Sequence, residues 1–291
     1  MKAHGKGAAL AAAGSVLWGA SGIAGQVLLQ DKGVTPEWLS AARMIGAGVL
    51  LLALTAQRGE RLFPIWREKA LSLLLFGVLG MIGVQYTYFA AIALSNAAPA
   101  TILQYTMPIL VILGTALTER RMPGARVLAA LVLAVGGVAL LVTRGEWGTL
   151  AISEEALFWG LLSAAGAAFY TVQPKAMIRR YPASLVVGWG MLIGGITLAP
   201  TAGLFSPPGL WDGAALASLA FVIVFGTALA FWLYISSVEY IEPPEASLLN
   251  SLEPLSSILF SAVFLGMTFG GAECAGAAAV ILAVAAVTRR G

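Results

Sequence analysis

Long apolar stretches alternate with short polar segments along the whole chain. Ten of these stretches approach the roughly 20 residues that a helix needs to cross the hydrocarbon core of a membrane. The pattern predicts an all-α integral membrane protein with ten transmembrane helices. The predicted spans are residues 8–29, 37–56, 71–93, 98–118, 124–143, 156–178, 183–204, 214–238, 244–266 and 270–288.

The two halves of the chain carry the same residues at the same intervals. A shift of 146 positions superimposes the first half on the second without a gap. The pairs that coincide are Gly14/Gly160, Pro36/Pro182, Gly48/Gly194, Gly80/Gly226, Tyr88/Tyr234, Ala100/Ala246, Leu103/Leu249, Pro108/Pro254 and Gly124/Gly270. Each half has five predicted helices, an odd number, so the second half must enter the membrane from the opposite side. The sequence predicts one membrane domain of two inverted five-helix repeats, residues 1–145 and 146–291, with a substrate site where they meet.

The composition excludes an ordinary soluble domain. Hydrophobic residues make up 59% of the chain and charged residues 11%, against about 25% charged residues in soluble domains. The single cysteine, Cys274, cannot form an internal disulfide. The net charge of +3 does not indicate nucleic acid, because the basic residues gather in particular loops and not along one face. The expected partners are membrane lipid and a small-molecule substrate, and the chain is expected to act as a monomer or a homodimer.

The basic residues indicate an orientation in the membrane. Of the 17 Lys and Arg residues, 14 fall on the side that holds both termini, Lys32 and Arg144 fall on the other side, and Arg43 lies within a span. Because cytoplasmic loops carry an excess of Lys and Arg, the N- and C-termini are predicted to be cytoplasmic.

Residues that many enzymes need are missing from the chain. His4 is the only histidine and lies in the terminal segment, so the sequence offers no His/Cys metal cluster and no Ser-His pair within the membrane. No Gly-rich P-loop motif is present to hold ATP phosphates. The chain is therefore not expected to be an enzyme, and no cofactor or metal is expected.

Two charged residues lie deep inside predicted spans. At about 1.5 Å per residue, Arg43 is roughly 9 Å from the outer end of the second span and Glu253 about 13 Å from the inner end of the ninth. Such charges are costly in hydrocarbon and are candidates for function. Arg43 lies near a helix end and is interpreted as a structural element, whereas Glu253 is a candidate for proton coupling. Pro108 and Pro254 are expected to kink their helices.

Polar and aromatic residues recur at depths that a substrate can reach. An apolar wall with a few placed hydrogen-bonding groups is typical of small-molecule sites. The candidates for a substrate-binding cavity are Trp18, Gln85, Tyr88, Gln104, Tyr105, Tyr170, Trp189, Trp232 and Asn250. The alternative for tryptophans and tyrosines near span ends is interfacial anchoring. Because Arg43 is the only cation in the membrane interior, away from the span ends, a neutral or zwitterionic substrate is expected in place of a polyanion.

Several short motifs occur in an order and spacing that are known from one transporter family. They are Trp18-Gly19, Ala41-Ala42-Arg43, Met107-Pro108 followed by Glu119-Arg120, Leu252-Glu253-Pro254 and Phe264-Leu265-Gly266. With them the chain resembles the EamA family of the drug/metabolite transporter (DMT) superfamily, and within it the YddG-type exporters of aromatic amino acids. The resemblance implies a central cavity, a bacterial inner-membrane location and export. Met267 stands where the family usually has a glutamate, which argues against a mechanism that needs this acid in both halves.

The sequence thus predicts a secondary transporter that exports small neutral or zwitterionic metabolites, above all aromatic and apolar amino acids, by alternating access around a central cavity. The alternative is a multidrug or other metabolite exporter of the same family. A passive channel is disfavoured, since Leu, Val and Ala interrupt the polar positions along the helices.

Overall fold

The computed structural model describes residues 2–118, 120, 124–146, 151–237, 240–241 and 249–288. Every regular element within these ranges is helical. The elements are α1 (Lys2–Gln26), η1 (Val27–Asp31), α2 (Pro36–Gln57), α3 (Pro64–Leu75), η2 (Phe76–Ile82), α4 (Gly83–Leu94), α5 (Ala97–Gln104), α6 (Met107–Thr118), α7 (Ala125–Thr143), α8 (Glu154–Val172), α9 (Lys175–Ile178), α10 (Ala183–Ala202), α11 (Gly213–Ala220), η3 (Phe221–Leu229), α12 (Ala230–Ser237), α14 (Leu252–Leu265) and α15 (Gly271–Thr288). The three η elements are π-helical segments.

Six helical runs in the described part are long and apolar enough to cross a membrane. They are His4–Asp31, Pro36–Gln57, Pro64–Leu94, Glu154–Ile178, Ala183–Ala202 and Gly213–Tyr234. Shorter apolar helices lie over the predicted fourth, fifth, ninth and tenth spans, at Ala97–Val111, Leu128–Thr143, Leu252–Leu265 and Gly271–Ala286. The described part of the chain is therefore all-helical and suited to several membrane crossings, and the count of ten stays a prediction.

Prolines interrupt helices that the apolar pattern predicts to be continuous. The predicted fourth span is divided between Gln104, where α5 ends, and Met107, where α6 begins. Pro108 is therefore in the first turn of α6, where a missing backbone N–H costs least. Pro254 likewise lies in the first turn of α14, and Pro174 directly precedes α9. The structure thus has helix starts where kinks within helices were expected, and each break leaves backbone groups outside the helical hydrogen-bond pattern.

Polar side chains cap several helices at their first turns. The Thr35 hydroxyl accepts a hydrogen bond from the backbone N–H of Trp38 at the start of α2. Ser153 and Asp212 cap α8 and α11 in the same way. These caps pair backbone donors that have no partner within the helix. Short polar loops are thus enough to end one apolar helix and begin the next.

Two of the π-helical segments occupy equivalent places in the two halves. A shift of 146 positions moves η2, at residues 76–82, onto residues 222–228, which lie within η3. Each segment leads directly into a helix that faces the middle of the molecule, α4 after η2 and α12 after η3. Because π-helical turns often occur at functional sites, the middle of the molecule is where a site is expected.

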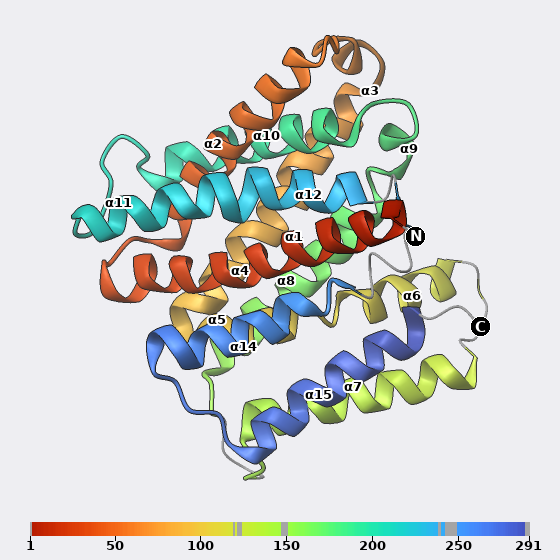
Figure 1. Ribbon diagram of the computed structural model, residues 1–291, viewed down its shortest axis with the longest axis vertical. Coiled ribbons are helices and arrows are strands. Elements are labelled where there is room, and N and C mark those ends of the chain that lie inside the picture. The colour runs from red at the N-terminus through yellow and green to blue at the C-terminus, as the bar shows by residue number, and fades with distance from the viewer. Residues whose placement is uncertain are drawn as a thin grey trace.

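Helices at equivalent places in the two halves also pack in equivalent ways. The pair α2 and α10 lies at one edge of the molecule, and the pair α7 and α15 lies at the opposite edge (Figure 1). Between these edges, α4 packs on α8 as α12 packs on α1. A Cβ atom on Gly137 of α7 would lie 2.7 Å from the carbonyl oxygen of Gly276 on α15, so only glycine allows this close approach. The helices between the two edge pairs surround a cavity.

Candidate functional site

A cavity of about 400 Å³ lies in the middle of the molecule, a size typical of small-molecule sites. Side chains from α1, α2, α4, α5, α8, α12 and α14 contribute to its lining. The lining includes the predicted residues Trp18, Arg43, Gln85, Tyr88, Gln104, Tyr105, Tyr170, Asn250 and Glu253. The structure thus brings together residues from both halves that lie far apart in the sequence.

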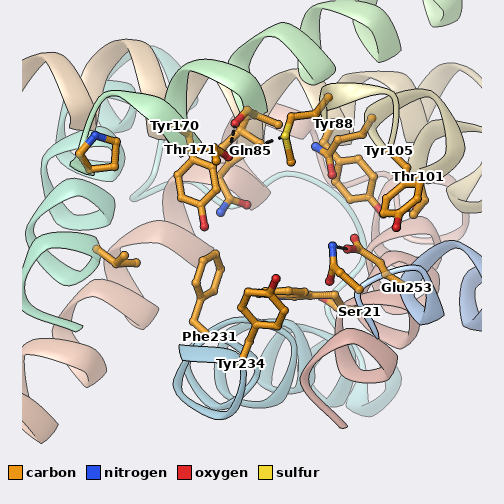
Figure 2. Close-up of a pocket in the computed structure, with 18 of the residues that line it drawn as sticks. Ser21, Gln85, Tyr88, Thr101, Tyr105, Tyr170, Thr171, Phe231, Tyr234 and Glu253 are labelled. Atoms are coloured by element: carbon orange, nitrogen blue, oxygen red, sulfur yellow. Dashed lines mark hydrogen bonds between the residues drawn. The ribbon is translucent and has the colours of Figure 1, made fainter. Parts of the chain in front are cut away.

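Five aromatic side chains form one part of the lining, here called the aromatic wall. The ring centroid of Trp18 lies 5.0 Å from that of Phe231 and 5.1 Å from that of Tyr234. The Tyr170 ring lies 6.3 Å from Phe231 and stacks on Phe76 at 6.0 Å. Figure 2 shows Tyr170, Phe231 and Tyr234 around the open space of the cavity. These rings offer apolar faces on which an aromatic or apolar part of a ligand can pack.

Phe76 and Phe231 were not among the predicted site residues. Phe231 corresponds to Gln85 at the 146-residue shift, so the internal repeat was a signal that could have found it. Phe76 corresponds to Val222 and carries no such signal. In an apolar stretch, a phenylalanine that faces lipid looks the same as one that faces protein, because lipid tails are as apolar as the protein interior.

Arg43 on α2 is buried, with 5% of its surface exposed. Its Nε donates a hydrogen bond of 2.6 Å to Oγ1 of Thr227, which lies in η3. Its guanidinium carbon lies 5.1 Å from the ring centroid of Phe89. Among the residues that the structure describes, Arg43 makes no other hydrogen bond and no ion pair. The terminal guanidinium nitrogens can therefore donate to a group within the cavity.

Glu253 reaches the cavity from the first turn of α14 (Figure 2). Its Oε2 accepts a hydrogen bond of 3.5 Å from Nδ2 of Asn250. Asn250 is positioned in turn by Ser15 of α1, whose hydroxyl donates to the Asn250 Oδ1 at 3.0 Å. Because a carboxylate can accept several hydrogen bonds, Glu253 retains the capacity to take up a proton or a cationic group.

The other predicted polar residues differ in whether their side chains form hydrogen bonds with the protein. The Tyr88 hydroxyl lies 2.8 Å from Oγ1 of Thr101, and both are buried. The Gln104 amide donates to the hydroxyl of Ser163. Gln85, in contrast, makes no side-chain hydrogen bond within the described ranges, although only 5% of its surface is exposed. Its amide is therefore available to a ligand.

Trp189 and Trp232 lie outside the cavity lining, in contrast to their predicted position. Nε1 of Trp189 donates to the carbonyl oxygen of Leu62 at 2.9 Å, and its ring packs edge-on against Trp66. The ring of Trp232 lies 5.7 Å from the guanidinium carbon of Arg58, at the end of α2. Both tryptophans hold the segment between α2 and α3. The sequence predicted how deep within a span the two tryptophans lie. It did not predict the direction in which their side chains point.

The cavity is not centred along the bundle. Pro174, Ile178 and Ala183 line it at the end where α9 joins α8 to α10, which is also the end where α1 begins (Figure 1). Beyond the opposite end of the cavity, α1 and α5 are joined, because Oε1 of Gln26 accepts a hydrogen bond of 2.8 Å from the backbone N–H of Ala97. Both residues are buried. The cavity lining therefore includes residues at the α9 end, whereas Gln26 and Ala97 lie outside it.

Comparison with known families decides the class of protein. The EamA-like transporter family matches residues 5–143 and again residues 155–289, nearly the whole chain. The chain belongs to this family. Of the residues that carry the resemblance, Glu119 lies outside the described residues.

Three relatives of this EamA-like transporter indicate its general activity. The uncharacterized inner membrane transporter YicL of Salmonella typhimurium is 39% identical, over 88% of this chain and 86% of its own. The threonine/homoserine exporter RhtA of the same species is 28% identical, over 82% and 79% of the two chains. The aromatic amino acid exporter YddG of Ancylobacter novellus is 30% identical, over 54% of each chain. Family and relatives are transporters and not enzymes, so the chain is a membrane transporter.

In an EamA-like transporter, this cavity suits a ligand with two unlike parts. The aromatic wall can hold an apolar group by packing and dispersion. Arg43, Glu253 and Gln85 can bind a polar or charged group by hydrogen bonds. No residue that lines the cavity within the described part is a lysine, and Arg43 is its one arginine. A ligand with several negative charges would therefore lack enough partners.

Proposed function

We propose that this EamA-like transporter exports small neutral or zwitterionic metabolites, chiefly aromatic and apolar amino acids. The observation that carries the proposal is the aromatic wall beside Arg43, which is buried, and Glu253, which is half-buried, in one cavity. Rings attract an apolar side chain, and charged groups of both signs suit a head group that has both signs. The names of two relatives support the substrate class, since RhtA is a threonine/homoserine exporter and YddG an aromatic amino acid exporter.

We infer further that ten transmembrane helices form two inverted repeats, residues 1–145 and 146–291. The separate family matches to each half support a duplication. The equivalent packing of equivalent helices, and the equivalent places of η2 and η3, support a pseudo-two-fold relation between the halves. Five crossings per half would invert the second half. Rocking of two such halves gives alternating access to a site between them.

The protein is proposed to lie in a bacterial inner membrane with both termini in the cytoplasm. The excess of Lys and Arg on the side of the termini supports this orientation. The cavity extends toward that side, since Pro174, Ile178 and Ala183 line its α9 end. In this orientation the structure would receive substrate from the cytoplasm, as an exporter must before it turns outward.

Glu253 is proposed to couple export to proton movement. It is the one carboxylate among the described residues that line the cavity. Ionisable groups within membrane spans commonly mark proton and substrate pathways. A carboxylate that releases its proton on one side and regains it on the other would link the proton flux to substrate flux.

Counterflow in proteoliposomes tests the proposed function. Purified protein is reconstituted, the vesicles are loaded with unlabelled phenylalanine, and uptake of labelled phenylalanine is followed. A carrier that alternates between two states exchanges substrate, so trans phenylalanine accelerates uptake. A passive channel shows no acceleration, and an exporter of lipophilic cations shows acceleration by those cations and none by amino acids. Either of these two results would contradict the proposal.

Variants of the same preparation localise transport to the cavity. Phe231→Ala removes a ring of the aromatic wall, and we expect it to raise the KM for phenylalanine by up to about tenfold, the upper end of an aromatic pair energy. Phe225→Ala removes an exposed ring of η3 and serves as the matched control. Glu253→Gln is expected to retain counterflow at raised phenylalanine concentrations but to lose the response to an imposed pH gradient. An unchanged response in that variant would remove the coupling role.

A further inference from the structure

Arg43 and Glu253 are two opposite charges that line the same cavity and come from different halves of the chain. No ion pair joins them in the described part of the structure. They are nevertheless close enough to attract each other electrostatically, and Tyr88 lies within range of both. The two charges therefore face a common space that no protein group bridges.

Each of the two charged groups has unused hydrogen-bonding capacity. Arg43 commits only its Nε, to Thr227, and neither terminal nitrogen has a hydrogen bond to the described residues. The Glu253 carboxylate has a single hydrogen bond, at the long distance of 3.5 Å from Asn250. A buried charge without a partner is strongly destabilising, and the arrangement becomes favourable when a bound group completes it.

We propose that Arg43 and Glu253 are the two poles of a binding site for the head group of an α-amino acid. The guanidinium of Arg43 binds the α-carboxylate through its two free nitrogens, and the carboxylate of Glu253 binds the α-ammonium. This inference rests on the proposed function, because it specifies how that substrate class is recognised.

The position of the aromatic wall fits this assignment. Trp18 and Ser21 lie three residues apart on α1, so they share one face of that helix and both line the cavity. Phe231 and Tyr234, which contact Trp18, continue the wall from this face of α1. A substrate whose head group lies between Arg43 and Glu253 would place its side chain on these rings. Side chains of different size would bind, while the head group stays constant.

The site predicts a particular discrimination between ligands. Phenethylamine lacks the carboxylate of phenylalanine, and 3-phenylpropionate lacks the ammonium. Either analogue would leave one buried charge without a partner. Sites built to pair such groups reject analogues that lack one of them far more strongly than apolar pockets reject a change of size.

Equilibrium binding of these three ligands to the purified protein, measured by calorimetry in detergent, tests the inference without any mutation. We expect phenylalanine to bind about 10- to 100-fold more tightly than either analogue, in line with hydrogen bonds to charged groups. Equal affinity for phenylalanine and phenethylamine would overturn the role of Arg43. Equal affinity for phenylalanine and 3-phenylpropionate would overturn the role of Glu253.

Charge-removing variants then assign each discrimination to a residue. Arg43→Gln is expected to bind phenylalanine and phenethylamine equally, and Glu253→Gln to bind phenylalanine and 3-phenylpropionate equally. Arg43→Lys keeps the charge and should keep part of the preference for phenylalanine, which also covers the case in which Arg43→Gln does not fold. Arg58→Gln and Glu60→Gln, at exposed positions, are the matched controls and should bind all three ligands as the parent does.

The possible failures are distinguishable. If Arg43→Gln or Glu253→Gln weakens all three ligands by the same factor, the residue is structural and the inference fails, while amino acid export can still stand. If the parent binds and exchanges amino acids without discriminating against the analogues, the inference alone fails. If counterflow shows no exchange of any amino acid, the proposed function fails and the inference fails with it.

Discussion

The two halves of this transporter share their backbone but differ in the chemistry that they bring to the cavity. Position pairs related by the 146-residue shift line the cavity together: Ser21/Ala167, Gln85/Phe231, Tyr88/Tyr234, Gln104/Asn250 and Met107/Glu253. The charged groups have no charged counterparts, since Arg43 corresponds to Trp189 and Glu253 to Met107. The difference teaches that helix packing can stay equivalent in the two halves while the cavity lining that they share becomes chemically asymmetric.

The largest expected effect is a difference in stability between variants of two equivalent glycines, Gly14 and Gly160. A Cβ atom on Gly14 would lie 2.9 Å from the backbone oxygen of Ala230, whereas one on Gly160 would meet the side chain of Leu103. We expect Gly14→Val to destabilise the protein by about 1–3 kcal/mol and by more than Gly160→Val, because a side chain can move aside more readily than a backbone. Thermal unfolding in detergent measures both. Equal losses would show that the two helix contacts, on α12 and α5, are equally rigid.

A smaller difference in stability is expected between variants of the equivalent tyrosines, Tyr88 and Tyr234. The hydroxyl of Tyr88 is paired with Thr101 at 2.8 Å, whereas that of Tyr234 has no hydrogen bond to any residue in the described ranges. Tyr88→Phe should therefore lower stability by about 1 kcal/mol, the usual contribution of a buried hydrogen bond. Tyr234→Phe should leave the stability unchanged. The same unfolding measurement applies, and a loss in Tyr234→Phe as large as that in Tyr88→Phe would contradict the assignment.

The smallest effect concerns an ion pair that has no equivalent in the other half. Lys32 Nζ donates to Asp212 at 2.7 Å, whereas the equivalent positions hold Ile178 and Trp66. The hydrogen bond from Lys32 lowers the pKa of Asp212, and the backbone N–H of Ala215 lowers it further. Because the folded-state pKa is below the unfolded-state value, the pair stabilises the fold above the unfolded-state pKa. This contribution is lost as the pH falls through the folded-state pKa.

The unfolding temperatures of the parent and Asp212→Asn should therefore differ at neutral pH and converge in acid. Asparagine retains the helix cap of α11, so the comparison isolates the ion pair. A difference that persists unchanged into acid would show that the pair does not contribute. High salt should reduce the difference at neutral pH as well, since the pair is exposed on one side.

The sequence was informative where length and apolar content decide the structure. Apolar stretches correctly located the helices of the described part, and the depth of Arg43 and Glu253 correctly indicated that both are removed from lipid. Sequence patterns were less informative about the direction in which side chains point. In a membrane helix the lipid face and the core face are both apolar, so the pattern did not show that Trp189 points to Leu62 or that Phe76 belongs to the cavity lining.

The breaks between helices were also hard to predict. Pro108 and Pro254 indicated disturbed helices, but a kink and a new start are both compatible with a proline in an apolar stretch. The structure resolves the choice through the turn at Tyr105 and Thr106, where the chain leaves α5 before α6 begins. Such a turn needs tertiary partners to pair its backbone, and a single sequence does not reveal them.

The π-helical turns of η2 and η3 affect the direction in which side chains on the following helices point. Removing one residue from a helix rotates everything that follows by about 100°. Deletion of one residue anywhere in residues 76–82 would therefore rotate Gln85 and Tyr88 toward other neighbours. The length and the apolar composition of α4 would not change. η3 has the same irregularity at the equivalent place in the second half, where it sets the direction of the side chains on α12.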